Sequence, residues 1–205
     1  MPKWLSTSNT NEMRGLISLD DGMRVLNRLV EQLHDSDSII RENSAYLLGE
    51  MALEAKALSH NTLKSMEQLE GLNILANPKN TAIVVKELIK GLVDVDPWVR
   101  GNAADALGKI GSIEAVVPLS ALQKDKDKVV RYSATEAIGS IGSAESVDYL
   151  IEALLDEEWS VRLIAAKSLE RIPNKRAESA LKKTAKDSNA DVRQRSLSAL
   201  AKLPA

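Results

Sequence analysis

Residues 94–111 read DVDPWVRGNAADALGKIG, and this stretch decides the fold because its pattern returns at a fixed distance along the chain. An arginine recurs every 31 residues, at Arg100, Arg131, Arg162 and Arg193. Six residues before each of these stands an aspartate: Asp94, Asp125, Asp156 and Asp187. An earlier copy keeps the same spacing with Asp35 and Arg41. Recurrence of this kind inside one chain indicates a repeat architecture, in which each unit is one small supersecondary element.

Each copy carries the pattern of an amphipathic helix, which we name the A helix. In the quoted copy, apolar side chains stand one residue before Arg100 and three, seven and ten residues after it. This spacing follows the 3.6-residue period of an α-helix. We expect the helices to begin after N-caps at Asp37, Asp96, Asp127 and Asn189, with Glu158 as a weaker cap in the fourth copy. Their expected ends are Gly111, Gly142, Pro173 and Pro204.

A second, shorter apolar segment follows each stop and predicts a B helix. The segments are 115–124, 146–155 and 177–186, and the aligned leucines are Leu88, Leu119, Leu150 and Leu181. One helix pair cannot bury its own apolar faces, so neighbouring pairs must stack. We expect small residues such as Ala103 to let adjacent A helices approach closely. The aspartate and arginine columns should then form ladders along the stack, with each arginine bonded to carboxylates or to turn carbonyls.

The repeat is irregular near the N-terminus, because 59 residues separate Arg41 from Arg100. The surplus at 53–80 predicts either an inserted helix, at about residues 61–72, or a degenerate repeat. A turn at Asn77-Pro78 and a B helix over about 80–93 should follow. We divide the chain into a polar N-terminal tail, 1–17, and a solenoid, 18–205.

The two ends of the solenoid are expected to carry single, unpaired helices. Residues 20–34 predict a B helix that caps the N-terminal end. The final A helix, 189–203, has no B helix after it, and its far side is a candidate homodimer contact.

The quoted stretch, with its Ala-Leu-Gly-x-Ile-Gly ending, resembles the HEAT-like repeat named after phycobilisome lyases. The resemblance covers roughly residues 18–205 and is specific for fold, with little content for function. It implies an all-α protein, a right-handed α-α superhelix of about five helix pairs. In that family the A helices lie on the convex side and the B helices line the concave side. Its members include chromophore lyases, a metal-dependent hydroxylase, DNA glycosylase relatives and many binding scaffolds.

The composition excludes several kinds of catalytic site. The chain has no Cys, which rules out disulfides, thiolate zinc sites, iron–sulfur clusters and cysteine nucleophiles. Its two histidines cannot build a site with three His ligands. The family's hydroxylase needs several His-Glu dipeptides, whereas this chain has only His34-Asp35 and His60-Asn61. We therefore expect no enzymatic activity, no cofactor and no metal site.

The charge is nearly balanced, at −2, which argues against attraction of the whole surface to nucleic acid or anionic lipid. Residues 171–205, however, hold nine basic and three acidic side chains. Nucleic-acid binding through this basic end is one alternative function, although a solvated helix face explains most such runs. The chain begins with no apolar core of signal-peptide length and has no run approaching ~18 apolar residues. We predict a cytoplasmic protein that does not enter a membrane.

The concave B-helix face is where we expect a partner to bind, because solenoids present such surfaces to their ligands. Removing the core positions leaves the candidates Lys86, Lys90, Val117, Pro118, Asp148, Tyr149, Glu152 and Lys183. Tyr149 is the expected anchor, since tyrosine is large, amphipathic and low in entropy cost. The mixed charge favours a protein or peptide over a polyanion, although these side chains could equally serve only to solvate the groove.

The leading hypothesis is a non-enzymatic protein-interaction scaffold. Nucleic-acid binding through 171–205 is one alternative, and an accessory subunit or lyase-like enzyme of the same repeat family is another. Trp98 and Trp159, at the starts of two A helices, are expected to pack over the ridges between repeats.

Overall fold

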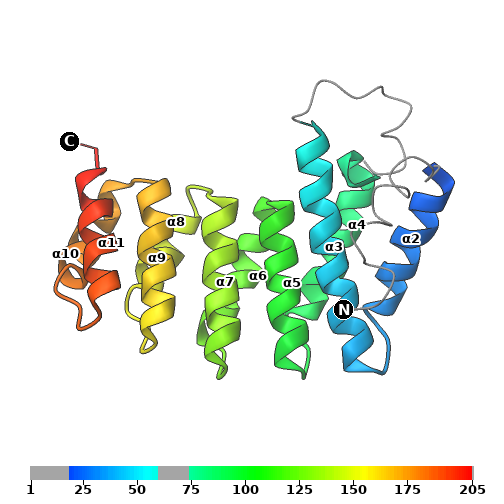
Figure 1. The fold of residues 1–205 in the computed structure, drawn as a ribbon, viewed down its shortest axis with the longest axis horizontal. Coiled ribbons are helices and arrows are strands. Elements are labelled where there is room, and N and C mark those ends of the chain that lie inside the picture. Colours follow the sequence, from blue (N-terminus) through cyan, green and yellow to red (C-terminus); the bar gives the residue numbers. More distant parts are fainter. Residues whose placement is uncertain (1–18, 60–73, 205) are drawn as a thin grey trace, which may run out of the picture.

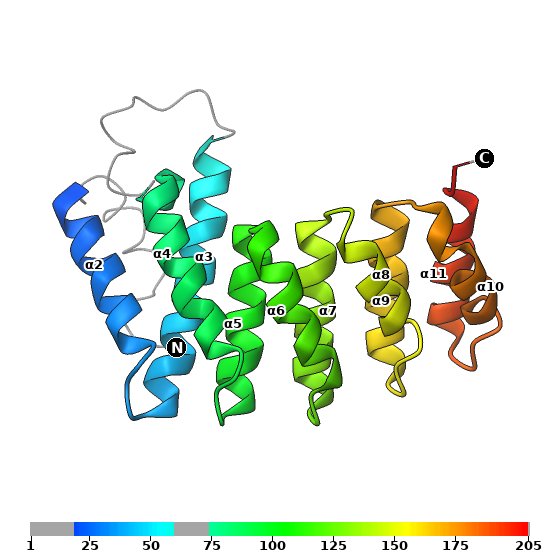
Figure 2. The same cartoon turned by 180° about the vertical axis from the view of Figure 1, so that it is seen from behind.

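The fold is a single row of helix pairs arranged in two layers (Figure 1). The structure is a computed structural model that describes residues 19–59 and 74–204, and these residues contain ten α-helices and no strand. One layer holds the A helices: α3 (Ser38–Ser59), α5 (Pro97–Ile110), α7 (Lys128–Ile141), α9 (Trp159–Arg171) and α11 (Ala190–Ala201). The other layer, seen in Figure 2, holds the B helices: α2 (Leu19–Gln32), α4 (Pro78–Gly91), α6 (Val116–Ala121), α8 (Ser146–Ala153) and α10 (Glu178–Thr184). The predicted all-α superhelix is confirmed.

Short 3₁₀ turns complete the B-helix layer. They are η3 (Ile74–Ala76), η4 (Ile113–Ala115), η5 (Leu122–Lys124) and η6 (Lys175–Ala177). Each lies directly before or after a B helix, except that η3 is separated from α4 by Asn77.

The helix boundaries follow the capping residues expected from the repeat. Asp96 accepts the backbone N–H of Trp98 at 2.9 Å, and Pro97 occupies the first position of α5. Glu158 makes no side-chain cap bond, in keeping with its weaker capping chemistry. Gly111 and Gly142 end their helices at φ 77° and 65°, a left-handed conformation that favours glycine.

The first A helix is longer than the others, and this length was not anticipated. Helix α3 has 22 residues, against 12 to 14 for the other A helices. Ala52 stands at the repeat position that Gly111 holds in the next copy, so no glycine or proline stops α3 there. The helix expected at 61–72 lies outside the described residues, as does the tail 1–17. The choice between an insertion and a degenerate repeat therefore stays a prediction.

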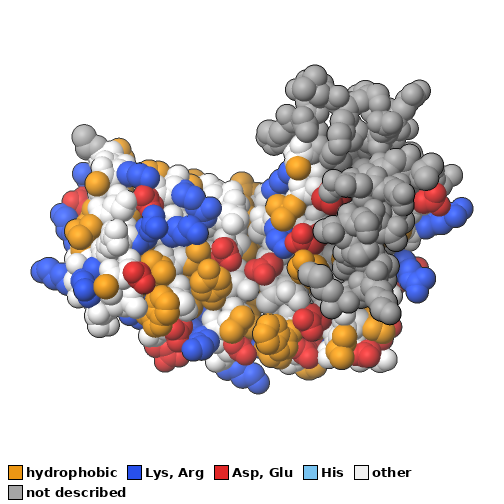
Figure 3. All heavy atoms as spheres, in the orientation of Figure 1, with side chains coloured by type: hydrophobic (Ala, Val, Ile, Leu, Met, Phe, Trp, Pro, Cys, Tyr) orange, Lys and Arg blue, Asp and Glu red, His pale blue; other side chains and the backbone are white. Residues whose placement is uncertain are grey.

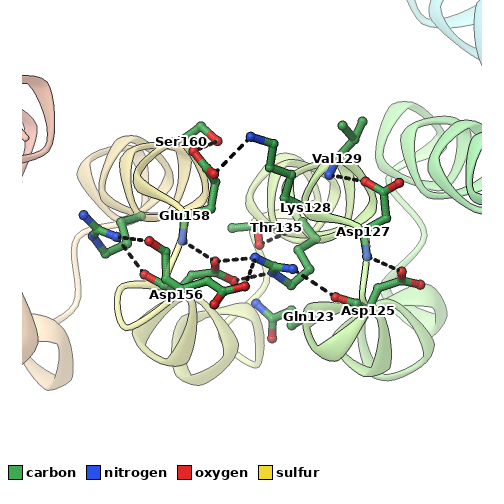
Figure 4. Close-up of polar contacts among 12 residues, drawn as sticks. Gln123, Asp125, Asp127, Lys128, Val129, Thr135, Asp156, Glu158 and Ser160 are labelled. Carbon is green, nitrogen blue, oxygen red and sulfur yellow. Dashed lines mark hydrogen bonds and ion pairs between the residues drawn. The ribbon is translucent and has the colours of Figure 1, made fainter.

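A ladder of ion pairs joins the turns that precede the A helices, as the repeat predicted. Nε and Nη2 of Arg100 donate to the carboxylate of Asp125 at 2.7 and 2.9 Å, and its Nη1 donates to the carbonyls of Asp94 and Val95. The same bidentate pair recurs as Arg41–Asp94, Arg131–Asp156 and Arg162–Asp187. Figure 4 shows the rung between α7 and α9, with Asp125 and Asp156 on either side of the arginine. Hydrogen bonds from Arg41 hold the pKa of Asp94 below its ordinary value.

Glu170 provides a different link, between α9 and α11. It stands at the position that Gly108 and Gly139 hold in earlier copies, and it accepts from Arg195 at 2.6 Å and from Ser198 at 2.7 Å. Lys202 pairs with it at 2.9 Å. Hydrogen bonds from Lys202, Arg195 and Ser198 lower the pKa of Glu170 to about 2.

This shift makes a pH-dependent contribution to stability. Because the folded-state pKa lies below the ordinary value, the stabilisation is present above about pH 4.5 and is lost as the pH falls through 2. We expect Glu170→Gln to lower the free energy of unfolding by about 1–2 kcal/mol at pH 7. The loss is smaller than the full shift implies, because Arg195 and Lys202 are 42% and 56% exposed and solvent screens them.

Urea denaturation at several pH values measures this contribution. The difference in free energy of unfolding between wild type and Glu170→Gln should decrease steadily from pH 5 to pH 3. Glu114→Gln, a change at an exposed carboxyl, should leave no gap at either pH. A gap for Glu170→Gln that is the same at pH 7 and pH 3 contradicts the assignment.

Candidate protein-binding surface

The B helices present two rows of side chains that the core does not use. The aligned leucines Leu88, Leu119, Leu150 and Leu181 are fully buried. Residues two positions before and two positions after each leucine lie four apart, so they share the outer face of the helix. All eight of these positions are exposed: Lys86, Val117, Asp148 and Ser179 in one row, and Lys90, Ala121, Glu152 and Lys183 in the other. The B layer therefore offers a continuous series of side chains of mixed character.

Two of the eight sequence candidates are less available than expected. Tyr149 is half-buried and packs against the hydrophobic core, and its carbonyl accepts from the side chain of Gln123 at 3.0 Å. Pro118 is also half-buried. Tyr149 therefore helps to brace α8 against the preceding repeat, and only part of its ring can contact a partner.

The charged candidates differ in how far they are already neutralised. Lys90 pairs with Glu87 at 2.7 Å, and the hydrogen bonds from Lys90 and His34 lower the pKa of Glu87. Asp148 accepts two hydrogen bonds from Arg176, at 2.7 and 2.9 Å. In the described part of the chain, no ion pair reaches Lys86, Glu152 or Lys183. Of the charged candidates, these three remain available on the B-helix face.

The basic C-terminal end is partly neutralised within the fold, because five of its cations share three carboxylates. Figure 3 shows Lys and Arg side chains gathered over α9 and α11. Of the nine basic residues in 171–205, five are in ion pairs with Asp148, Glu170 or Glu178: Lys175, Arg176, Lys182, Arg195 and Lys202. Arg193 donates to the carbonyls of Asp187 and Ser188. Paired cations contribute little to the attraction of a polyanion.

The two tryptophans at the starts of A helices are partly exposed. Trp98 is 60% exposed and Trp159 is 45% exposed, and the expected packing over inter-repeat ridges stays a prediction. Both lie at the starts of A helices, where Figure 3 shows apolar side chains along the lower edge of the molecule. The structure thus shows exposed apolar groups at the turn edge of the A-helix layer.

The described residues hold neither a cluster of metal-binding side chains nor a membrane-spanning helix. In residues 19–59 and 74–204, no group of three or more His, Asp and Glu side chains is placed to hold a metal ion. None of the helices that the structure describes combines the length and apolar character needed to cross a membrane.

The sequence profile of HEAT repeats matches residues 68–138 and 117–201, which together make up more than half of the chain. The architecture therefore defines an α-solenoid, and the chain belongs to the HEAT repeat family. No curated protein matches it in sequence.

Solved structures with the same fold have varied functions. The complex of CpcE and CpcF of phycocyanin lyase from Nostoc sp. PCC7120 is 19% identical, with a TM-score of 0.63, over 87% of this chain and 66% of that one. A designed armadillo repeat protein in complex with the peptide (KR)4 is 20% identical, with a TM-score of 0.62, over 98% and 94%. Human deoxyhypusine hydroxylase is 19% identical, with a TM-score of 0.51, over 97% and 80%. Likeness at this level shows the fold and leaves the function to the site.

Proposed function

We propose that this protein is a non-enzymatic scaffold that binds a protein or peptide partner through its B-helix face. The observation that carries the proposal is the pair of exposed rows on successive B helices. Their side chains are not needed by the core, yet they combine apolar and charged groups of both signs. Stacked repeats commonly use such an extended face for recognition.

The electrostatics favour a protein partner over nucleic acid. The four arginines from Arg41 to Arg162 in the repeat column are held by aspartates of the next repeat, so they are not free to bind phosphates. Five of the nine basic residues at the C-terminal end are also in ion pairs. Lys86, Glu152 and Lys183 leave a mixture of signs on the B face, which suits the mixed charge of a protein surface. The designed armadillo protein with its bound peptide supports the proposal only as an example of a related fold.

Charge reversal at the available groups tests this siting. The variant Lys86→Glu, Glu152→Arg, Lys183→Glu changes three exposed side chains that make no ion pair within the described residues, so it should fold normally. In a quantitative pull-down from the cells that make the protein, we expect the recovered amount of each specific partner to fall at least about fivefold relative to wild type. The matched control, Lys167→Glu with Asp191→Arg, alters exposed residues on the A helices and should retain them. Retention of every partner by the triple variant contradicts the siting on the B-helix face.

A further inference from the structure

A second feature of the surface is an open groove between two successive turns. The turn between α4 and α5 and the turn between η5 and α7 border this shallow, open groove, whose volume is about 650 Å³. We name it the turn groove and define it by Val93, Val95, Ala121, Lys124 and Lys126. Arg100 connects the two turns, because it donates to the carboxylate of Asp125 and to the carbonyls of Asp94 and Val95.

The valines of the turn groove are not required by the fold. Val93 and Val95 are 83% and 88% exposed, and they flank the ladder residue Asp94. The equivalent positions in the other turns hold His34 and Ser36, Lys124 and Lys126, Leu155 and Glu157, or Lys186 and Ser188. The same turn therefore accepts polar and charged side chains. Two adjoining exposed valines are better explained by a contact with another molecule than by stability.

The unpaired charge in the turn groove is positive. The carboxylate of Asp94 is bound by Arg41 and that of Asp125 by Arg100, with both oxygens used in each pair. In the described residues, Lys124 and Lys126 form no ion pair. Two free ammonium groups therefore lie beside two exposed aliphatic side chains.

The capping carboxylates of the two turns accept hydrogen bonds from backbone amides and lie outside the turn groove. Asp96 and Asp127 bind the first backbone amides of α5 and α7, at 2.9 and 2.8 Å. Neither residue lines the turn groove.

We propose that the turn groove binds an acidic, aliphatic segment of a partner protein. An aliphatic side chain of the segment packs on Val93 and Val95, and its neighbouring carboxylates pair with Lys124 and Lys126. The inference rests on the proposed function in one respect, that the ligand is a protein chain. It adds a second contact region, at the edge of the B-helix layer next to Ala121, and it states the chemistry of the segment.

The test uses the full chain and a random peptide library displayed on phage. The first variant, Val93→Lys with Val95→Ser, introduces the residue types found in the turn at 186–188. The second variant, Lys124→Leu with Lys126→Glu, introduces those found in the turn at 155–157. Because the repeat already accommodates these side chains, both variants should fold. We expect the wild-type chain to enrich peptides with an aliphatic residue beside Asp or Glu. The Kd of the best peptide should rise at least about tenfold in each double variant and less than about twofold in the control Leu155→Lys.

Several results would overturn the inference. These are no enriched sequence, a basic consensus, or an affinity that neither double variant changes. A further contrary result is that the chain binds single-stranded oligothymidylate more tightly than any selected peptide and loses that binding in Lys124→Leu with Lys126→Glu. This result would identify the groove as a nucleic-acid site instead. Peptides sensitive to the Lys86, Glu152 and Lys183 variant but not to the groove variants overturn this inference and leave the proposed function standing. Sensitivity to the groove variants alone supports the inference, and the B-helix siting is then decided by the pull-down with the triple variant.

Discussion

Replacing Gly108 with alanine should lower the free energy of unfolding by about 2–3 kcal/mol, an effect typical of overpacking in a tight helix contact. The same substitution at Gly101, two turns earlier in α5, should be neutral or stabilising. The contrast arises because the two glycines differ in what an added methyl group would meet.

At Gly108 the added Cβ would lie 2.7 Å from the Cα of Ala137 and 2.9 Å from its Cβ. These atoms belong to helix α7 and cannot move without shifting its backbone, so the two A helices must separate. At Gly101 the nearest atom is the hydroxyl oxygen of Ser133 at 3.7 Å, an ordinary contact. Alanine there gains up to about 1 kcal/mol from its higher helix propensity.

Urea denaturation followed by circular dichroism compares the two variants directly. The matched pair removes the general effect of changing glycine to alanine in α5, so the difference reports the close approach of α5 and α7. Equal stability of Gly108→Ala and Gly101→Ala would show that the A helices do not pack as closely as the structure has them.

The repeat period allowed much of the fold to be predicted, because the decisive interactions recur in every copy. The N-caps, the buried leucines and the Arg–Asp ladder each depend on residues at fixed offsets, and a column of five copies identifies them. The length of α3 was missed, although Ala52 in the column of Gly111 and Gly142 already lacked a stop signal. Residues 61–72 match none of these repeat columns, so the 31-residue period cannot predict them.

The surface was predicted less well, since exposed positions are free to vary between copies. The position of Trp98 holds Ile39, Val129, Ser160 and Asp191 in other copies, and this variation itself indicates a surface site. The turn groove was missed for a related reason. Its valines flank the invariant aspartate of the repeat, and only a comparison of the five turns shows that they are unusual.

Removing a ladder arginine should have a larger effect than any surface change. We expect Arg100→Met to lower the free energy of unfolding by about 3–5 kcal/mol, the usual cost of leaving one member of a buried pair alone. Methionine keeps the aliphatic packing but leaves the carboxylate of Asp125, 11% exposed, without its partner. The carbonyls of Asp94 and Val95 also lose their donor.

The pH dependence of this loss identifies its origin. Burial alone would raise the pKa of Asp125, but hydrogen bonds from Arg100 and Asp127 hold it below the ordinary value. In wild type this carboxylate therefore stabilises the fold above about pH 4, and the contribution is lost as the pH falls through the lowered pKa. In Arg100→Met, only the Asp127 amide and the nearby charge of Lys126 oppose the effect of burial on the pKa of Asp125, and protonation relieves the unpaired charge. The cost of the variant should shrink as the pH falls from 7 to 3.

Arg193→Met is the matched control, because Arg193 occupies the same repeat position without an aspartate partner among the described residues. Its Nη1 donates to the carbonyls of Asp187 and Ser188 at 2.8 and 2.9 Å, as its counterparts do in their own turns. Losing only these bonds should cost about 0.5–1.5 kcal/mol, with little change between pH 7 and pH 3. Urea denaturation of both variants at the two pH values separates the contributions. If the two variants cost the same at pH 7, the link between repeats does not depend on the arginine–carboxylate pairs, and the carbonyl bonds within each turn carry the stability instead.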